Sequence, residues 1–318
     1  MTQSISCPCR EYLGNPEQFA YAEKFLFDDG PGAGMRGIRV STGAGLVFTI
    51  LPDRGMDLWR AEFLGRTFSW ISPCGPKRPD LLEHGDFSWL RNWGGGLLTT
   101  AGLQNVGSPC DFQGVHHTLH GRISNIPAQA VSIRRIHANQ GSHDPKAEDI
   151  LEISGEVHEV SVFGEHLKLS RKITLSAGSN KIRIQDHIEN AGFKSAPAQI
   201  LYHMNLGWPL LSENSVLAAR KHAVTPRNET ALKGIRMWDQ CEPPQPSYEE
   251  QCFYHDIPAD EDGFARISLF NPINSLRFTV AYLKEELPFF TQWKQMGQGE
   301  YVLGLEPATC HPEGLDAE

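Results

Sequence analysis

A glutamate near the C-terminus, Glu306, is the residue of this sequence best placed to take up and return a proton. It ends a segment, residues 300–306, in which large apolar side chains occupy every second position, the period expected of a β-strand. Pro307 follows and cannot donate to a sheet ladder, so Glu306 is predicted to be the last side chain of an apolar strand. Burial there raises the pKa of a carboxylate toward neutrality, where it can act as a general base. The simpler alternative is a salt-bridged or solvated carboxylate at a strand end.

A histidine in a second apolar segment, His203, is the best candidate for a proton donor. Within residues 197–209, strand geometry places Leu201, His203 and Asn205 on one face, so an imidazole lies in an otherwise apolar strand. Imidazole titrates near neutral pH and can therefore donate a proton and recover it. The alternative is a hydrogen-bonded histidine in the core.

A metal site is not expected. The only local group among the 13 histidines is His116, His117 and His120. The surrounding proline and glycines predict a loop or strand, in which positions 117 and 120 point to opposite faces. Zinc sites need three or four converging ligands. The glycine run at 94–96 matches neither a phosphate loop nor a dinucleotide fingerprint, so no nucleotide cofactor is expected either.

Two charged residues, Arg54 and Asp57, occupy a turn between predicted strands at 45–51 and 58–63. Loops carried by rigid strands are where binding residues commonly lie. The alternative is a local surface ion pair worth less than ~1 kcal/mol.

The composition favours a globular protein that binds a small neutral molecule. The 318 residues, 40% of them hydrophobic, suffice for one large all-β domain or two ordinary ones. The 29 Lys and Arg against 38 Asp and Glu give a net charge of -9, and no basic run stands out. The electrostatic footprint of a protein that binds nucleic acid or an anionic membrane is therefore missing.

The same features suggest a cytoplasmic location. The seven cysteines are an odd number spread along the chain, which favours free thiols in a reducing compartment. No apolar run approaches the ~20 residues that a membrane helix needs. Residues 1–10 lack the apolar region of a signal peptide.

Strand patterns dominate from residue 36 onward. Clean alternation of apolar and polar residues between 128 and 190 predicts antiparallel strands with one solvated face. The insert at 139–148 is expected to be an exposed loop tip. We predict a single β-sandwich domain over residues 1–318, in which residues 1–35 form an irregular N-terminal extension with a short helix at 16–24.

Four blocks, in this order, resemble the aldose 1-epimerase (galactose mutarotase) superfamily. They are His120-Gly121, Tyr202-His-Met-Asn-Leu206, Phe290-Thr-Gln-Trp293 and Gly304-Leu-Glu-Pro307. Three further blocks resemble a bacterial branch of that superfamily: Asp53-Arg-Gly-Met-Asp57, Gly95-Gly-Leu-Leu98 and Glu306-Pro-Ala-Thr-Cys-His-Pro-Glu-Gly314. The likeness in order and spacing covers residues 36–314.

The resemblance implies an antiparallel β-supersandwich that holds a sugar in a cleft on one sheet. It assigns Glu306 as the base that takes the proton of the anomeric hydroxyl and His203 as the acid that protonates the ring oxygen. It also implies that His120 binds sugar hydroxyls and that Gln292 lies at the pocket floor. This chemistry needs no metal or redox cofactor.

The sequence departs from that family around the expected site. Tyr202 replaces the asparagine before the histidine, Met204-Asn205 replaces Tyr-Phe-Asn, and Asp239 is a poor match to the substrate-gripping Asp-Phe-Arg block. The charged pocket candidates are Arg54, Asp57, Arg122 and Lys294. Cationic side chains there would suit an acidic or phosphorylated sugar. Asn205 and Asp239 complete the expected binding residues.

Two other functions stay open at this point. One is a non-catalytic carbohydrate-binding or sensing protein, because fold likeness alone does not establish chemistry. The other is a glycoside hydrolase, which needs a second carboxylate across the cleft from Glu306, with Asp57 and Glu313 as candidates. Assembly into a homodimer also stays open.

Overall fold

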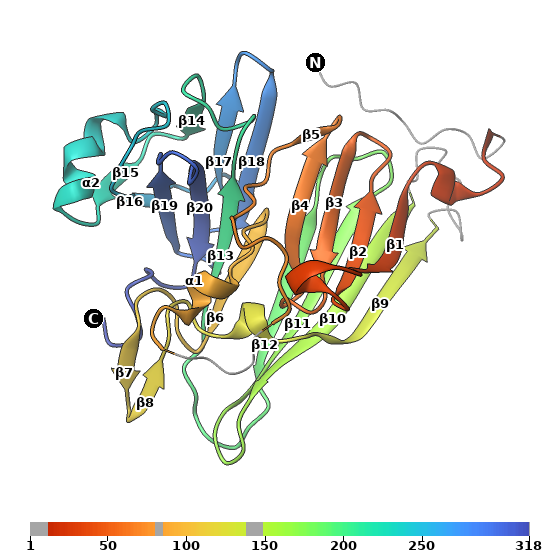
Figure 1. Ribbon diagram of the computed structural model, residues 1–318, viewed down its shortest axis with the longest axis horizontal. Helices are drawn as coiled ribbons and strands as arrows, with labels where there is room; N and C mark the ends of the chain where they lie inside the picture. The colour runs from red at the N-terminus through yellow and green to blue at the C-terminus, as the bar shows by residue number, and fades with distance from the viewer. Residues whose placement is uncertain (1–11, 80–84, 138–148, 318) are drawn as a thin grey trace. The chain divides into compact units, whose positions relative to one another are not determined.

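The computed structural model describes residues 12–79, 85–137 and 149–317, and this part of the chain is mostly antiparallel β-sheet (Figure 1). It divides into two compact units. The first comprises Met1–Gly65, Pro76–Leu81 and Ile123–Ala196, and the second comprises Arg66–Gly75, Leu82–Arg122 and Pro197–Glu318. The all-β class predicted from the alternating patterns is confirmed.

The first unit contains two antiparallel sheets. One runs in the order β1 (Tyr21–Leu26), β2 (Arg36–Ser41), β3 (Leu46–Leu51), β4 (Asp57–Phe63). The other has the order β12 (Arg183–Asn190), β11 (His166–Ser176), β10 (Ile150–Val160), β9 (Gln129–Ile136). Short 3-10 turns lie at Pro16–Gln18, Gly30–Gly32 and Ile123–Asn125.

Alternation explains how the sheet of β9 to β12 packs. In β10, Leu151, Ile153 and Val157 are buried while the residues between them are half-buried, with the exception of Gly155. The apolar face therefore turns inward. Arg171 of β11 reaches from this face to the carbonyl oxygen of Gly55, 3.2 Å away, in the turn after β3. The two sheets of this unit thus form a sandwich.

The N-terminal segment differs from the prediction. The helix expected at 16–24 is a single 3-10 turn, Pro16–Gln18, followed by strand β1. Six residue pairs, from Tyr21 opposite Ser41 to Leu26 opposite Arg36, join β1 to β2. Four of the six residues of β1 are exposed, so no alternating pattern marked the strand. Residues 1–11, with Cys7 and Cys9, and the predicted loop tip at 139–148 lie outside the described residues.

The second unit carries a six-strand antiparallel arrangement that sets up the candidate site. Its order is β6 (Leu98–Leu103), β13 (Gln199–Leu206), β20 (Val302–Ala308), β19 (Phe289–Gln295), β16 (Gln251–Asp256), β15 (Ala223–Pro226). A second sheet runs in the order β14 (Val216–Ala219), β17 (Phe264–Asn271), β18 (Leu276–Leu283). Tyr282 of β18 stacks on Phe290 of β19 with ring centroids 5.6 Å apart, so the second sheet covers the face of β19 that carries Phe290.

Small elements complete this unit. They are β5 (Arg66–Thr67), α1 (Ser88–Asn92), the hairpin of β7 (Cys110–Phe112) and β8 (Val115–His117), α2 (Glu229–Gly234) and a 3-10 turn at Ile235–Met237. Asn228 caps α2, because its side chain accepts a hydrogen bond from the backbone N–H of Ala231 at 2.9 Å. Among the described residues no helix has the length and apolar character needed to cross a membrane.

Candidate active site

An imidazole and a carboxylate meet on neighbouring strands of the second unit. Strand β13 pairs with β20 in a register that places Met204 opposite Leu305 and Asn205 opposite Gly304. The same register places His203 opposite Glu306, on the face away from the β14–β17–β18 sheet. Their side chains approach to 3.2 Å between Nε2 of His203 and Oε1 of Glu306, and both are buried. The two proton-handling residues chosen from the sequence therefore lie in one site.

Burial sets the protonation of this pair. Desolvation, helped by the negative charge of Glu250, raises the pKa of Glu306 well above its usual value, although the positive charge of Arg227 opposes the shift. Desolvation, with a contribution from His120, lowers the pKa of His203 to about 3. A protonated Glu306 beside a neutral His203 holds the same number of protons as a carboxylate beside an imidazolium. The site can therefore pass between these two forms by moving one proton between adjacent atoms.

Tryptophan rings wall the pair. The rings of Trp93 and Trp293 each lie 5.4 Å from the His203 ring, and 5.8 Å from each other. Trp89 stacks on Trp93 at 4.7 Å, and Trp70 lies 5.0 Å from Trp93. The indole N–H of Trp93 is fixed by the hydroxyl of Thr99, 3.0 Å away, on the strand next to His203. The aromatic rings therefore surround the His203 imidazole with apolar surface.

The second histidine of the site, His120, acts from a constrained backbone. Its φ is 59°, in the left-handed region that few side-chain-bearing residues adopt. The backbone N–H of Gly107 donates to its Nδ1 at 3.2 Å, so the neutral ring carries its proton on Nε2. Burial, with the charge of Arg227, lowers the pKa of His120 to about 4, which keeps the ring neutral. It lies 5.8 Å from the His203 ring. His120 is thus a neutral hydrogen-bond donor beside the pair.

Buried polar atoms without a hydrogen-bond partner among the described residues gather on this face. Oε1 of Glu306, Nδ1 of His203 and Oγ1 of Thr291 are three of them. Thr291 lies opposite Glu306 in the pairing of β19 with β20. Buried polar groups in folded proteins are almost always paired, and the exceptions concentrate at functional sites. The arrangement therefore favours a site for a polar ligand.

A glycine makes room for the pair. A Cβ added to Gly304 would lie 2.5 Å from Oε1 of Glu306 and 3.1 Å from Cε1 of His203. Gly304 faces Trp293 on the neighbouring strand. Any larger residue would displace the groups that define the site.

The structure does not bring Gln292 or Lys294 to this face. Both alternate with Thr291 and Trp293 along β19, so they point to the opposite side of the sheet. Gln292 donates to the carbonyl oxygen of Trp238 at 2.8 Å and pairs with Nε2 of His255 at 3.0 Å. Nζ of Lys294 contacts the carboxylate of Glu242 at 2.6 Å and is fully buried.

Asp239 and Asn205 also have roles in the backbone framework. Asp239 follows Trp238 on the Gln292 side of the sheet, where its carbonyl oxygen accepts from Leu217 N–H at 2.9 Å. Asn205 shares the face of His203 and is fully buried. Its amide nitrogen donates to the carbonyl oxygens of Gly96 and His203, at 3.0 and 2.9 Å, so it anchors the glycine segment beside the tryptophans.

The remaining charged candidates are divided between the two units. Arg54 and Asp57 are in the first unit, where the guanidinium of Arg171 contacts Asp57 at 2.9 Å and Asp186 at 2.7 Å. Burial lowers the pKa of Arg54 to about 10, and Asp57 opposes that shift. Arg122 is exposed, in the second unit, and its backbone N–H donates to Gly102 O at 3.0 Å.

No sequence pattern singled out Trp93, Trp293, Thr291 or Arg227 as a site residue. Trp293 is next to Gln292, the glutamine that the resemblance selected. The pairing of β19 with β20 shows that Trp293, and not Gln292, is on the face of Glu306. Arg227 lies beyond the end of β15, three strands away from Glu306. No local pattern marks it.

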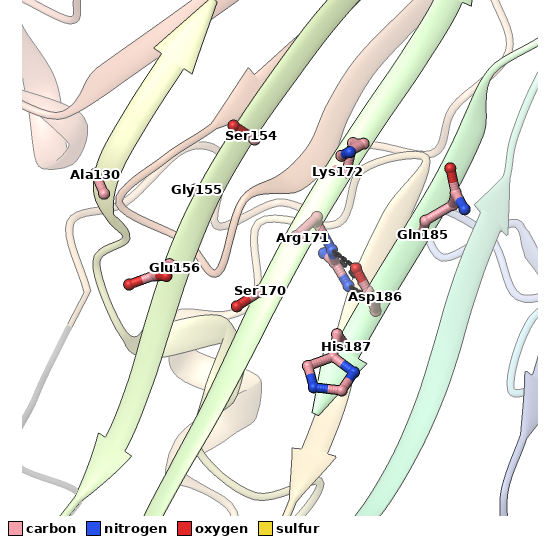
Figure 2. A pocket seen from close by; sticks show the side chains of 10 residues that line it. All are labelled: Ala130, Ser154, Gly155, Glu156, Ser170, Arg171, Lys172, Gln185, Asp186 and His187. Carbon is pink, nitrogen blue, oxygen red and sulfur yellow. Dashed lines mark hydrogen bonds and ion pairs between the residues drawn. The ribbon is translucent and has the colours of Figure 1, made fainter. Parts of the chain in front are cut away.

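A separate hollow of about 470 Å³ opens on the first unit (Figure 2). Figure 2 shows it over strands β9 to β12, with Arg171 and Asp186 joined by ion-pair contacts. Its histidine, His187, is exposed. The hollow lacks a paired acid and base, so it is not the candidate for catalysis. In the described part of the chain no group of three or more His, Cys, Asp or Glu is placed to hold a metal ion.

The fold and this site define a galactose mutarotase-like protein. More narrowly, the chain belongs to the family described as "Domain of unknown function (DUF4432)", whose model matches residues 32–318. A crystal structure of a candidate aldose 1-epimerase from Klebsiella pneumoniae is 25% identical, with a TM-score of 0.81 over 92% of this chain and 75% of that chain.

Two further solved structures share the fold. A galactose mutarotase-like protein from Clostridium acetobutylicum is 14% identical, with a TM-score of 0.60 over 92% of this chain and 89% of that one. Another from Lactobacillus casei is 12% identical, with a TM-score of 0.55 over 88% and 89%. No curated protein matches the chain significantly.

Proposed function

We propose that this protein is an aldose 1-epimerase-like enzyme that interconverts the α and β anomers of an aldose. The observation that carries the proposal is the buried contact of 3.2 Å between His203 and Glu306, beside the rings of Trp93 and Trp293. The fold likeness to the Klebsiella pneumoniae protein supports it. The small-molecule substrate would be a sugar or sugar derivative.

The spacing of the pair suits a hemiacetal. The anomeric hydroxyl oxygen and the ring oxygen are bonded to the same carbon, so an acid and a base that act on them must lie close together. Glu306 as carboxylate takes the proton of the anomeric hydroxyl while the bond from C1 to the ring oxygen breaks. His203 as imidazolium gives its proton to that oxygen, and the open-chain aldehyde forms.

The same two groups close the ring. After rotation about the C1–C2 bond, the hydroxyl that was the ring oxygen attacks the other face of the aldehyde. His203 takes back its proton and Glu306 returns one to the carbonyl oxygen. Each cycle leaves the enzyme with the protons it began with, so the mechanism needs neither oxidant nor reductant.

The surrounding residues bind and orient the sugar in this proposal. His120 offers an N–H donor from Nε2, because its Nδ1 already accepts from Gly107. The rings of Trp93 and Trp293 stack on the sugar and exclude water, which strengthens hydrogen bonds inside the site.

The test is the approach of freshly dissolved sugars to anomeric equilibrium, followed by polarimetry or NMR over a broad panel of aldoses. We expect Glu306→Gln and His203→Ala each to lose most of the enzyme-dependent rate, roughly 10²-fold or more. Glu261→Gln, at an exposed glutamate in the β16–β17 loop, is the matched control and should keep it. A wild type without enzyme-dependent exchange on any sugar, or active variants, would refute the assignment.

A non-catalytic carbohydrate-binding or sensing protein is the second candidate. The raised pKa of Glu306 favours it, because a protonated carboxyl hydrogen-bonds a sugar without abstracting a proton. Calorimetry that shows sugar binding without anomer exchange would select this function. The hydrolase has less support, since Asp57 is bound to Arg171 in the first unit and Glu313 accepts from the Tyr254 hydroxyl.

A further inference from the structure

An arginine that no motif marked, Arg227, follows strand β15 on the face of the sheet that carries the candidate site. The backbone N–H of Arg227 donates to Cys252 O at 3.0 Å, which extends the pairing of β15 with β16 by one residue. The register then continues from Cys252 to Trp293 and from Trp293 to Gly304. Arg227 thus shares one face with Trp293 and with the Gly304 that flanks Glu306.

The Arg227 side chain is held in a defined environment. Its Nε lies 3.9 Å from Oε1 of Glu313, and 28% of its side chain is exposed. The hydroxyl of Tyr254 donates to the same Glu313 oxygen. The thiol of Cys252 also hydrogen-bonds the Arg227 side chain, whose positive charge lowers the pKa of His120 and that of Glu306.

Two charges that act on Glu306 oppose one another. His203 lies on the neighbouring strand β13, Arg227 lies beyond β15, and Glu250 lies just before β16. Glu250 is fixed by the indole N–H of Trp293, which donates to its Oε2 at 2.7 Å. A cation and an anion, each held by a neighbour, therefore act on one buried carboxyl group from the β15–β16 side of the sheet.

We infer that Arg227 is a positioning residue that favours the ionised form of the Glu306–His203 pair, and that Glu250 acts in the opposite direction. Glu313 and Tyr254 hold the guanidinium in place. The inference rests on the proposed function, because only the carboxylate–imidazolium form can begin ring opening. A guanidinium suits this role, since it stays charged when partly buried.

The signs follow from electrostatics. Without the Arg227 charge, the carboxylate of Glu306 is less stable, so the proton stays on Glu306 and the reactive form becomes rarer. The pair also loses its shared proton at a higher pH. Without the Glu250 charge, both effects reverse.

The experiment compares pH–rate profiles of the full chain and four variants on an aldose that the wild type accepts. Arg227→Met should lower kcat about tenfold and move the alkaline limb up by about one pH unit, with KM changed less than about twofold. Arg227→Lys should restore most of the wild-type kcat and most of the wild-type position of the alkaline limb. Glu250→Gln, which keeps an oxygen for the Trp293 indole, should move the limb down. Arg236→Met, an exposed arginine in the 3-10 turn, is the control.

A wild-type profile in Arg227→Met, or equal damage in Arg227→Lys, would overturn the inference. So would a shift of the same sign in Glu250→Gln.

A readout that needs no turnover separates this failure from failure of the proposed function. NMR titration of the His120 imidazole should move to higher pH in Arg227→Met, and the infrared band of the protonated Glu306 carboxyl should persist to higher pH. If no sugar is turned over yet both shifts appear, the proposed function fails and the electrostatic role of Arg227 stands. If neither shift appears, the role of Arg227 fails.

Discussion

Gly304 lies so close to Glu306 that a single methyl group cannot be added: the added Cβ would be 2.5 Å from the carboxylate oxygen Oε1. Gly304 lies in a buried strand, where glycine has no stabilising role of its own. The position of Gly304 beside the imidazole–carboxylate pair therefore explains why a glycine is present there. The absence of a side chain at Gly304 leaves room for the close approach of the imidazole and the carboxylate.

Gly304→Ala should therefore damage the site more than the fold. The methyl group pushes the carboxylate away from His203, and a displacement of this size costs roughly 10²-fold in rate where geometry is critical. Anomer exchange and thermal unfolding of the same samples measure the two effects. Gly14→Ala, where an added Cβ meets nothing within 4 Å, is the control and should change neither. Full activity in Gly304→Ala would show that the pair is not positioned by this gap.

Replacing Glu306 should stabilise the protein at high pH. The pKa of Glu306 is raised in the folded state by burial, so its contribution to stability is fully present below the unfolded pKa and is lost as pH rises through the folded pKa. Glu306→Gln removes this loss. The free energy of unfolding of the variant should exceed that of the wild type at about pH 8, by a margin that shrinks toward about pH 5.

Denaturant titrations across that pH range measure the difference. The exposed Glu261→Gln variant is expected to give a flat difference. A Glu306→Gln variant that is less stable than the wild type at the alkaline end would show that Glu306 is charged and well paired when folded.

The sequence predicted the β class well because most strands have one dry face. Strands β10 and β11 alternate cleanly, and the structure pairs them over eleven residues each. Strand β1 was missed because its exposed residues have no pattern, and backbone pairing to β2 holds it in place. Local patterns detect burial, and they do not detect an exposed edge strand.

The candidate site was predicted only where residue type carried the information. Glu306 and His203 are ionisable groups in apolar strands, which a sequence shows directly. The choice of Gln292 instead of Trp293 depended on which face of β19 meets Glu306, and a shift of one residue reverses the face. Arg227 depended on the sheet order β15, β16, β19, β20, in which β16 and β19 are neighbours although they are not consecutive in the chain. The face that a strand turns toward the site and the order of strands in the sheet both depend on how strands pair. No single sequence segment encodes that pairing.

Acid should destabilise the protein through its buried histidines. Desolvation lowers the pKa of His255 to about 3, as His222 contributes to the same shift and Gln292 opposes it. The pKa values of His120 and His203 are lowered to about 4 and about 3. Their stabilising effect is fully present above the unfolded pKa of about 6.5, and it is lost as pH falls toward the folded values.

The variant His255→Gln tests this with least disturbance of the site, because His255 lies behind the sheet against Gln292. Between about pH 6 and pH 4, the slope of the unfolding free energy against pH should fall by the amount that corresponds to the uptake of about one proton on unfolding. The exposed His187→Gln variant should leave the slope unchanged. An unchanged slope in His255→Gln would mean that His255 takes up its proton in the folded state.

The buried arginine of the first unit should be more important for stability than any surface ion pair. The Arg171 side chain is fully buried and contacts Asp57 and Asp186, at 2.9 and 2.7 Å. Arg171→Met removes the cation that both buried carboxylates contact, and breaking a buried ion pair costs about 3–5 kcal/mol in other proteins. The neighbouring Lys172, half exposed and 3.5 Å from Glu152, is the control. Lys172→Met should cost less than about 1 kcal/mol. Denaturant midpoints of both variants, measured at one pH, give the comparison. Equal losses would show that the network of Arg171 contributes no more than an exposed pair.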